Sequence, residues 1–122
     1  MIFTIAYLVI KFTFVSLVIF ANVIFLHELG HFAYFKFVLG KNVEIRFMRE
    51  KGGYAFVVGH PADWKLLNSN EEYELNMMGI IMGLLPLVLI ALFSNMLYGV
   101  LVFPYLIGCW NDIKNSYEAF RR

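Results

Sequence analysis

Residues 27–31 read His-Glu-Leu-Gly-His, a pattern whose side chains could together carry out metal-dependent chemistry. Side chains four residues apart lie on one face of a helix, so His27 and His31 could bind the same metal ion. Glu28 is placed to accept a proton from a water molecule activated by that ion. Gly30 carries no side chain and would leave room for a substrate beside the metal. The pattern predicts a zinc centre for hydrolysis, with Glu28 as the catalytic base.

A catalytic zinc ion usually has three protein ligands and one open position, so a third ligand must come from elsewhere in the chain. We expect it to be Asp112, which lies near the end of the last apolar segment, at about the membrane depth of His31. Burying this carboxylate would be unfavourable without a metal ion or another compensating partner. His60 and Cys109 are the alternative third ligands.

The chain that must position these side chains is unusually apolar, with 61% hydrophobic and 16% charged residues among 122. Soluble domains are about 45–50% apolar and about 25% charged, so we expect a single domain embedded in the lipid bilayer. A net charge of +1 argues against nucleic-acid binding. A single cysteine excludes an intrachain disulfide, and three histidines are too few for a membrane di-iron oxidase.

Three apolar segments predict a mainly helical membrane protein with spans at about 7–38, 75–93 and 96–113. The first segment is long for one span, so a separate short N-terminal segment is the alternative. No basic residue precedes the first apolar run, and a cleaved signal peptide is therefore not expected. Gly79 and Gly83 form a G-x-x-x-G face, which would allow another helix to approach closely.

The polar stretch 41–73 between the first two spans predicts a small β-hairpin. Apolar and polar residues alternate over 43–48, and a Gly-Gly step at 52–53 precedes a second run with strand composition. Ser69 followed by Glu72 is typical of a capping box, which predicts that the second span begins near residue 70.

Two asparagines and one tryptophan near the predicted membrane surface could have roles of their own. Asn76 and Asn111 could donate hydrogen bonds to a substrate carbonyl. Trp64 suits the level of the lipid headgroups.

The basic residues predict the orientation of the chain in the membrane. Lys11 alone falls on the side opposite the polar stretch, and nine fall on the same side as it: Lys36, Lys41, Arg46, Arg49, Lys51, Lys65, Lys114, Arg121 and Arg122. Cytoplasmic loops carry the excess of basic residues, so the polar stretch and the metal centre are expected toward the cytoplasm. A prokaryotic plasma membrane fits this compact multi-pass chain.

These features resemble the site-2 protease family of intramembrane zinc metalloproteases, in particular its minimal, divergent zincin-like members. The resemblance covers most of the chain in layout, but little beyond residues 27–31 in specific motif. It includes the segment 40–44 before the hairpin, the helix with Gly79, Gly83 and Pro86, and an acidic residue on the third helix. Where the family usually has Leu-Asp-Gly, this chain has Asn111-Asp112-Ile113.

The resemblance implies a zinc-dependent endopeptidase that cleaves membrane-spanning or membrane-adjacent proteins. One Zn²⁺ would be held by His27, His31 and Asp112, and Glu28 would act as the base. The chain contains no PDZ domain, so substrate selection by such a domain is not expected. The alternative is a non-catalytic membrane protein that binds zinc or serves as a scaffold for a partner helix.

Overall fold

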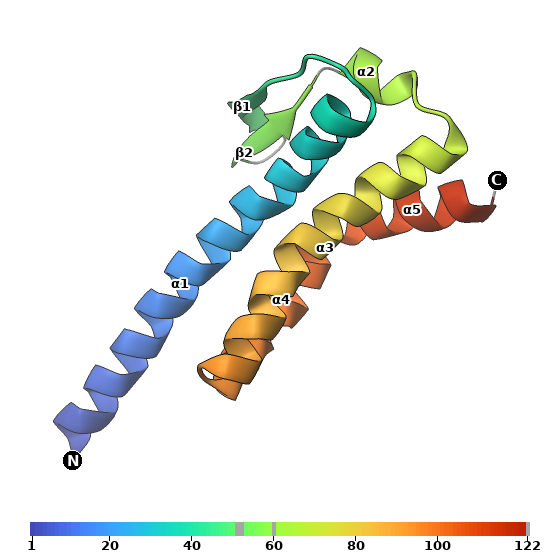
Figure 1. Ribbon diagram of the computed structural model, residues 1–122. Helices are drawn as coiled ribbons and strands as arrows, with labels where there is room; N and C mark the ends of the chain where they lie inside the picture. The colour runs from blue at the N-terminus through green and yellow to red at the C-terminus, as the bar shows by residue number, and fades with distance from the viewer. Residues whose placement is uncertain (51–52, 60, 122) are drawn as a thin grey trace.

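The computed structural model describes residues 1–50, 53–59 and 61–121 as a mainly helical chain with one small two-stranded sheet (Figure 1). Helix α1 (Ile2–Ala33) continues without a break into the π-helical turn η1 (Tyr34–Val38). The first apolar segment is therefore one helix that starts at Ile2, not at about residue 7. The alternative of a separate N-terminal segment is wrong, because the run from Ile2 holds no proline or glycine that would end a helix before Gly30.

The predicted hairpin is confirmed. Strands β1 (Ile45–Glu50) and β2 (Gly53–Val58) pair antiparallel, with Ile45 opposite Val58 and Glu50 opposite Gly53. Residues 51–52 of the predicted turn lie outside the described residues. A short helix that the sequence did not predict, α2 (Pro61–Lys65), follows the hairpin and carries Trp64.

Helix α3 (Ser69–Phe93) begins one residue earlier than the sequence predicted. Its N-cap is Asn68, whose side chain accepts a hydrogen bond of 2.9 Å from the backbone of Glu71, while Glu71 accepts one of 3.1 Å from the backbone of Asn68. The capping box is therefore formed by these two residues and not by Ser69 and Glu72. Asparagine caps a helix as well as serine does, and a glutamate three residues later completes either box, so local preference alone did not decide the position.

The last apolar segment is not the single helix that the sequence predicted over 96–113. It consists of a 3₁₀ helix, η2 (Met96–Leu101), helix α4 (Val102–Gly108) and helix α5 (Trp110–Arg121), and the chain bends by 62° at the junction between α4 and α5. Gly108 precedes this bend, and glycine is about 1 kcal/mol less favourable than alanine inside a helix. Helix α5 is amphipathic and buries Ser116 and Ala119.

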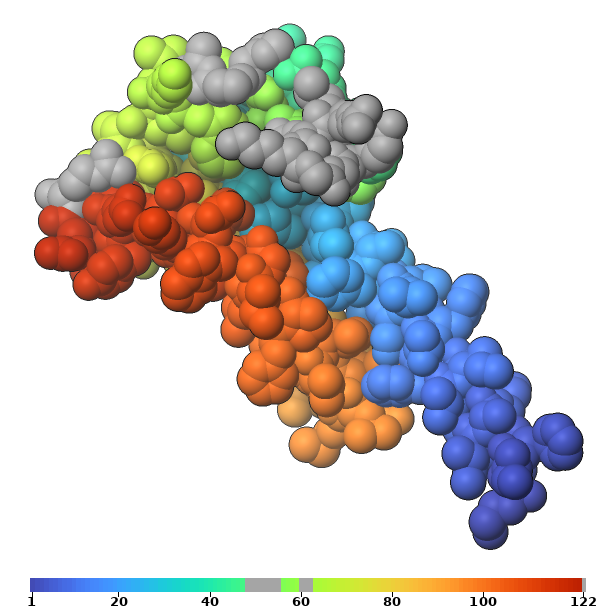
Figure 2. All heavy atoms as spheres, turned by 180° about the vertical axis from the view of Figure 1, so that it is seen from behind, coloured from blue at the N-terminus to red at the C-terminus, as the bar shows by residue number. Residues whose placement is uncertain are grey.

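Two helical segments within the described residues, Ile2–Val38 and Ser69–Phe93, are long and apolar enough to cross a membrane. The bent pair Met96–Gly108 and Trp110–Arg121 would make a third span if it crosses as one unit. The N-terminal part of α1 projects beyond the rest of the molecule in both the ribbon and the space-filling view (Figures 1 and 2). The architecture thus supports an association with membranes.

Buried apolar side chains in the described part of the chain form two clusters, one on each side of the His-Glu-Leu-Gly-His segment. The first lies toward the α3–η2 turn and contains Val23, Ile80, Leu87, Tyr105 and Cys109. The second lies toward the hairpin and contains Tyr34, Phe35, Val43, Val58 and Leu75. Both clusters join the continuous helix formed by α1 and η1 to α3. The His-Glu-Leu-Gly-His segment between the clusters is therefore packed against α3.

Gly30 has a different role from the one that the sequence suggested. A Cβ atom at this position would lie 2.8 Å from the carbonyl oxygen of Met78 and 3.0 Å from the Cα atom of Gly79. The missing side chain therefore lets the backbones of α1 and α3 touch, and it does not open a path for a substrate. Close helix contact of this kind is what small residues allow in membrane proteins.

Candidate metal centre

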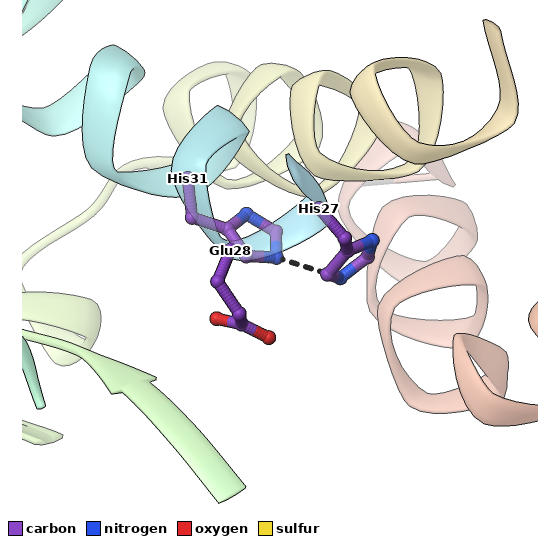
Figure 3. A group of neighbouring side chains, drawn as sticks. All are labelled: His27, Glu28 and His31. Atoms are coloured by element: carbon purple, nitrogen blue, oxygen red, sulfur yellow. Dashed lines mark hydrogen bonds between the residues drawn. The ribbon is translucent and has the colours of Figure 1, made fainter. Parts of the chain in front are cut away.

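Three of the four predicted site residues come from the last two turns of α1. His27, Glu28 and His31 present ligand atoms that all lie within 4.8 Å of one another (Figure 3). The two histidines are buried, with 6% and 2% of their surfaces exposed, and Glu28 is half-buried. The helical spacing in the sequence is enough to bring these side chains together, as predicted.

The fourth residue, Asp112, reaches the two histidines from the first turn of α5. Its Oδ2 atom lies 2.6 Å from Nε2 of His27 and 3.1 Å from Nε2 of His31. The two Nε2 atoms are themselves 3.1 Å apart. A small triangle of two ring nitrogens and one carboxylate oxygen is therefore formed between α1 and α5.

Hydrogen bonds on the far side of each ring indicate which nitrogen carries the hydrogen. Nδ1 of His31 lies 2.9 Å from the carbonyl oxygen of Leu75, and a carbonyl can only accept, so Nδ1 is the donor. Nδ1 of His27 lies 2.9 Å from the hydroxyl of Tyr105, which in turn donates to the carbonyl of Ile80 at 2.9 Å. A neutral ring with hydrogen on Nδ1 has a lone pair on Nε2, so both Nε2 lone pairs belong to the triangle.

With these tautomers the three corners of the triangle are all electron-pair donors, an arrangement that a bound cation would stabilise. Ligand atoms about 2.0–2.1 Å from a tetrahedral zinc ion lie about 3.3 Å from one another. The two separations of 3.1 Å are close to this spacing, whereas the 2.6 Å between His27 and Asp112 is the length of a charge-assisted hydrogen bond, so these two side chains would move apart to hold the ion. Imidazole nitrogen and carboxylate oxygen are among the ligands that zinc takes in proteins. A second proton on one ring would also relieve the repulsion, but the far-side hydrogen bonds are those typical of metal-binding histidines.

Of the two alternative third ligands, Cys109 does not compete with Asp112 in this arrangement. Sγ of Cys109 lies 3.5 Å from Nδ1 of His27, which is the nitrogen on the opposite side of the ring from the triangle. His60 lies outside the described residues. Among the described residues that the sequence offered, Asp112 is the one brought to the two Nε2 atoms.

A cavity of about 430 Å³ lies beside the triangle, and Glu28, Asn111, Asp112 and Phe56 line part of its wall. Glu28 points toward the hairpin side of α1, away from α3 (Figure 3). Of the two asparagines considered from the sequence, Asn111 lines this cavity, whereas Asn76 is buried and donates to the carbonyl of Glu72 at 2.8 Å. The cavity gives an extended chain a place next to both the triangle and Glu28.

The glycines of α3 accommodate the rings that surround the triangle. A Cβ atom at Gly79 would lie 2.6 Å from Nε2 of His31, and one at Gly83 would overlap the phenol ring of Tyr105. The G-x-x-x-G face predicted to bring helices together thus also leaves space for two rings. Gly79 makes room for His31, a candidate ligand, and Gly83 makes room for Tyr105, which hydrogen-bonds to the other candidate ligand, His27. Any larger residue at either position would displace these rings.

Two residues around the site were missed or interpreted differently in the sequence. Trp64 packs its ring edgewise against His31, with ring centroids 5.3 Å apart, and donates to the carbonyl of Val58 at 2.8 Å. It therefore covers the site, whereas the sequence suggested a headgroup anchor. Tyr105 was not singled out, although it lies four residues before Cys109 and seven before Asp112, a spacing that would put all three on one face of the single helix predicted over 96–113.

Comparison with protein-family models, with curated proteins and with solved structures finds no match to this chain. The resemblance to the site-2 protease family therefore stays a prediction from the sequence.

Proposed function

We propose that this protein is a zinc-dependent intramembrane endopeptidase that hydrolyses peptide bonds in membrane-spanning or membrane-adjacent proteins. The observation that carries the proposal is the triangle of His27 Nε2, His31 Nε2 and Asp112 Oδ2, with Glu28 at the adjoining cavity. A polar cluster that merely joined helices would not need two histidines four residues apart with a glutamate between them.

The residues of the triangle and Glu28 would have separate roles in hydrolysis. A zinc ion bound there would lower the pKa of a coordinated water toward about 7 and polarise the scissile carbonyl. His27, His31 and Asp112 would hold the ion and leave the cavity side open. Glu28 would accept the proton of the attacking water and pass it to the leaving amine, as a general base and then a general acid.

The hairpin and Asn111 would hold the substrate in an extended form. A spanning helix hides its carbonyls in its own hydrogen bonds, so it must unwind locally before it can be cleaved. Phe56 of β2 lines the same cavity as Glu28, so a hairpin edge beside the cavity could bind the unwound segment by strand addition. The side chain of Asn111 could donate a hydrogen bond to the substrate carbonyl.

The proposal includes the position of the chain in the membrane. We propose three spans, with the bent α4–α5 pair as the third, in the plasma membrane of a prokaryote. The distribution of basic residues supports an orientation with the metal centre toward the cytoplasm.

The first test is the zinc content of the purified protein. We expect about one zinc ion per chain in the wild type, since a catalytic site of this type holds one ion. The variant Asp112→Ala should lose most of the zinc, and Glu118→Gln, which changes an exposed carboxylate on the same helix, should retain it. A wild-type protein that takes up no zinc would overturn the proposal.

The second test is the cleavage of a single-span reporter protein in the same membrane. Glu28→Gln should keep its zinc but cleave at least about 100-fold more slowly, because general acid–base catalysis contributes about 10²–10⁴-fold. The variant Glu118→Gln should cleave at the wild-type rate. Zinc binding without cleavage would favour the non-catalytic alternative, and cleavage that survives Glu28→Gln would contradict the role of Glu28.

A further inference from the structure

The hydroxyl of Tyr105 lies where three helices meet, directly behind the candidate metal centre. Tyr105 belongs to α4 and is 2% exposed. Its oxygen lies 2.9 Å from Nδ1 of His27 on α1, and 2.9 Å and 3.2 Å from the carbonyl oxygens of Ile80 and Gly79 on α3. A buried tyrosine needs hydrogen-bond partners, and this one has them on both neighbouring helices.

The partners of this hydroxyl fix the direction of each hydrogen bond. A phenol has one hydrogen, and the carbonyls of Ile80 and Gly79 can only accept it. When the phenol hydrogen is directed at one of these carbonyls, the lone pairs of the Tyr105 oxygen accept from His27, which assigns the hydrogen of that ring to Nδ1. The chain Nδ1–H to Tyr105 to Ile80 is thus directional, and it leaves the lone pair of His27 on Nε2.

We infer that Tyr105 is a positioning residue, which holds His27 in the tautomer and ring orientation that present Nε2 to the metal. This inference rests on the proposed function, because it concerns the same centre. Without the hydroxyl, the remaining partner of Nδ1 would be Sγ of Cys109 at 3.5 Å, and a thiol is a weak acceptor. The ring could then turn or change tautomer, and the metal would lose an oriented ligand.

The surroundings of Tyr105 indicate that the hydroxyl, and not only the ring, matters at this position. The ring lies against Gly83, where any side chain would overlap it, and it packs edgewise on the His27 ring with centroids 5.8 Å apart. A phenylalanine would fill the same space and keep these contacts. The substitution Tyr105→Phe therefore removes the hydrogen bond while leaving the packing in place.

The chain provides a matched control in Tyr34. This residue is also buried, at 4% exposed, and its hydroxyl donates to Glu74 at 2.5 Å. The variant Tyr34→Phe therefore loses one buried hydroxyl hydrogen bond, as Tyr105→Phe does, but outside the His27 network.

The experiment measures zinc affinity by competition with a chelator, using the full chain in detergent micelles. We expect Tyr105→Phe to bind zinc 10–100-fold more weakly than the wild type, the usual effect of removing a hydrogen-bond partner of a metal-binding histidine. Tyr34→Phe should bind zinc as the wild type does. Equal affinities of the wild type and Tyr105→Phe would overturn the inference, whereas a wild type that binds no zinc would overturn the proposed function itself.

A second measurement reads the tautomer of the His27 ring directly, and its decisive outcome comes from the wild type alone. Nitrogen-15 NMR of the histidine side chains distinguishes hydrogen on Nδ1 from hydrogen on Nε2. In the zinc-loaded wild type, His27 should show hydrogen on Nδ1, and Tyr105→Phe should alter the signals of His27 but not those of His31. A wild-type His27 with zinc on Nδ1 would overturn the inference, whatever the fate of the variant.

Discussion

The two ends of helix α1 are both rich in apolar residues but lie in opposite environments. Toward the N-terminus, large apolar side chains are exposed, including Phe3 at 89% and Phe14 at 67%. Toward the other end of the same helix, Val23 is 1% exposed and both His27 and His31 are buried. The N-terminal end projects beyond the rest of the molecule, whereas the C-terminal end packs against α3 and the hairpin (Figures 1 and 2).

Apolar residues therefore serve two purposes in one helix: they form an exposed surface at its N-terminal end and a packed core at its C-terminal end. The N-terminal end exposes large apolar side chains, as a helix surface that faces lipid or a partner does. The C-terminal end combines buried apolar residues with Gly30 and the two histidines, which are suited to close packing and to chemistry.

A charge in the middle of the exposed face should oppose membrane insertion most strongly. Leu17 is 64% exposed and lies near the centre of the first candidate span. Leu17→Lys should raise the free energy of insertion of α1 by about 3 kcal/mol, because lysine replaces leucine at the depth of the hydrocarbon. A glycosylation-site reporter fused to the helix measures the inserted fraction. Leu66→Lys, at an exposed loop position, should have no effect, and equal insertion of both variants would contradict the spanning role of α1.

A single added methyl group should disrupt the packed end of the helix. Gly30→Ala places a Cβ atom 2.8 Å from the carbonyl oxygen of Met78, so α1 and α3 must separate. We expect a loss of about 2 kcal/mol in stability, within the range of overpacked cores, together with weaker zinc binding. Denaturant unfolding in micelles and zinc titration measure the two effects.

The control for this substitution is Gly108→Ala, since a Cβ atom at Gly108 meets nothing within 4 Å. Alanine is the better helix former, so this variant should be as stable as the wild type or more so. If Gly30→Ala behaves like Gly108→Ala, the close approach of α1 and α3 has no energetic importance.

Shortening one valine to alanine at each end of α1 should give the smallest effect on stability. Val23→Ala empties part of the core and should reduce stability by about 1.6 kcal/mol, at about 0.8 kcal/mol for each buried methylene-sized group. Val9 is 58% exposed on the same helix, and Val9→Ala should change stability by less than about 0.5 kcal/mol. The measurement is thermal unfolding in micelles, and equal losses at both positions would show that the N-terminal end is packed as well.

The parts of the molecule that follow from local chain geometry could be predicted from the sequence. His27 and His31 share a helix face because one turn of backbone hydrogen bonds separates them, and the alternation over 43–48 specifies a strand. The apolar run 75–93 and the capping signal before it specify a long helix within an error of one residue at its start.

The parts that depend on how helices rotate and bend against one another were decided by the tertiary structure. The sequence indicated that Asp112 lies at a suitable depth, but the bend between α4 and α5 determines where its carboxylate points. The partners of Nδ1 in both histidines, Tyr105 and the carbonyl of Leu75, come from other helices at distant positions in the chain. Such contacts are governed by packing between whole elements, and no pattern within a single helix encodes them.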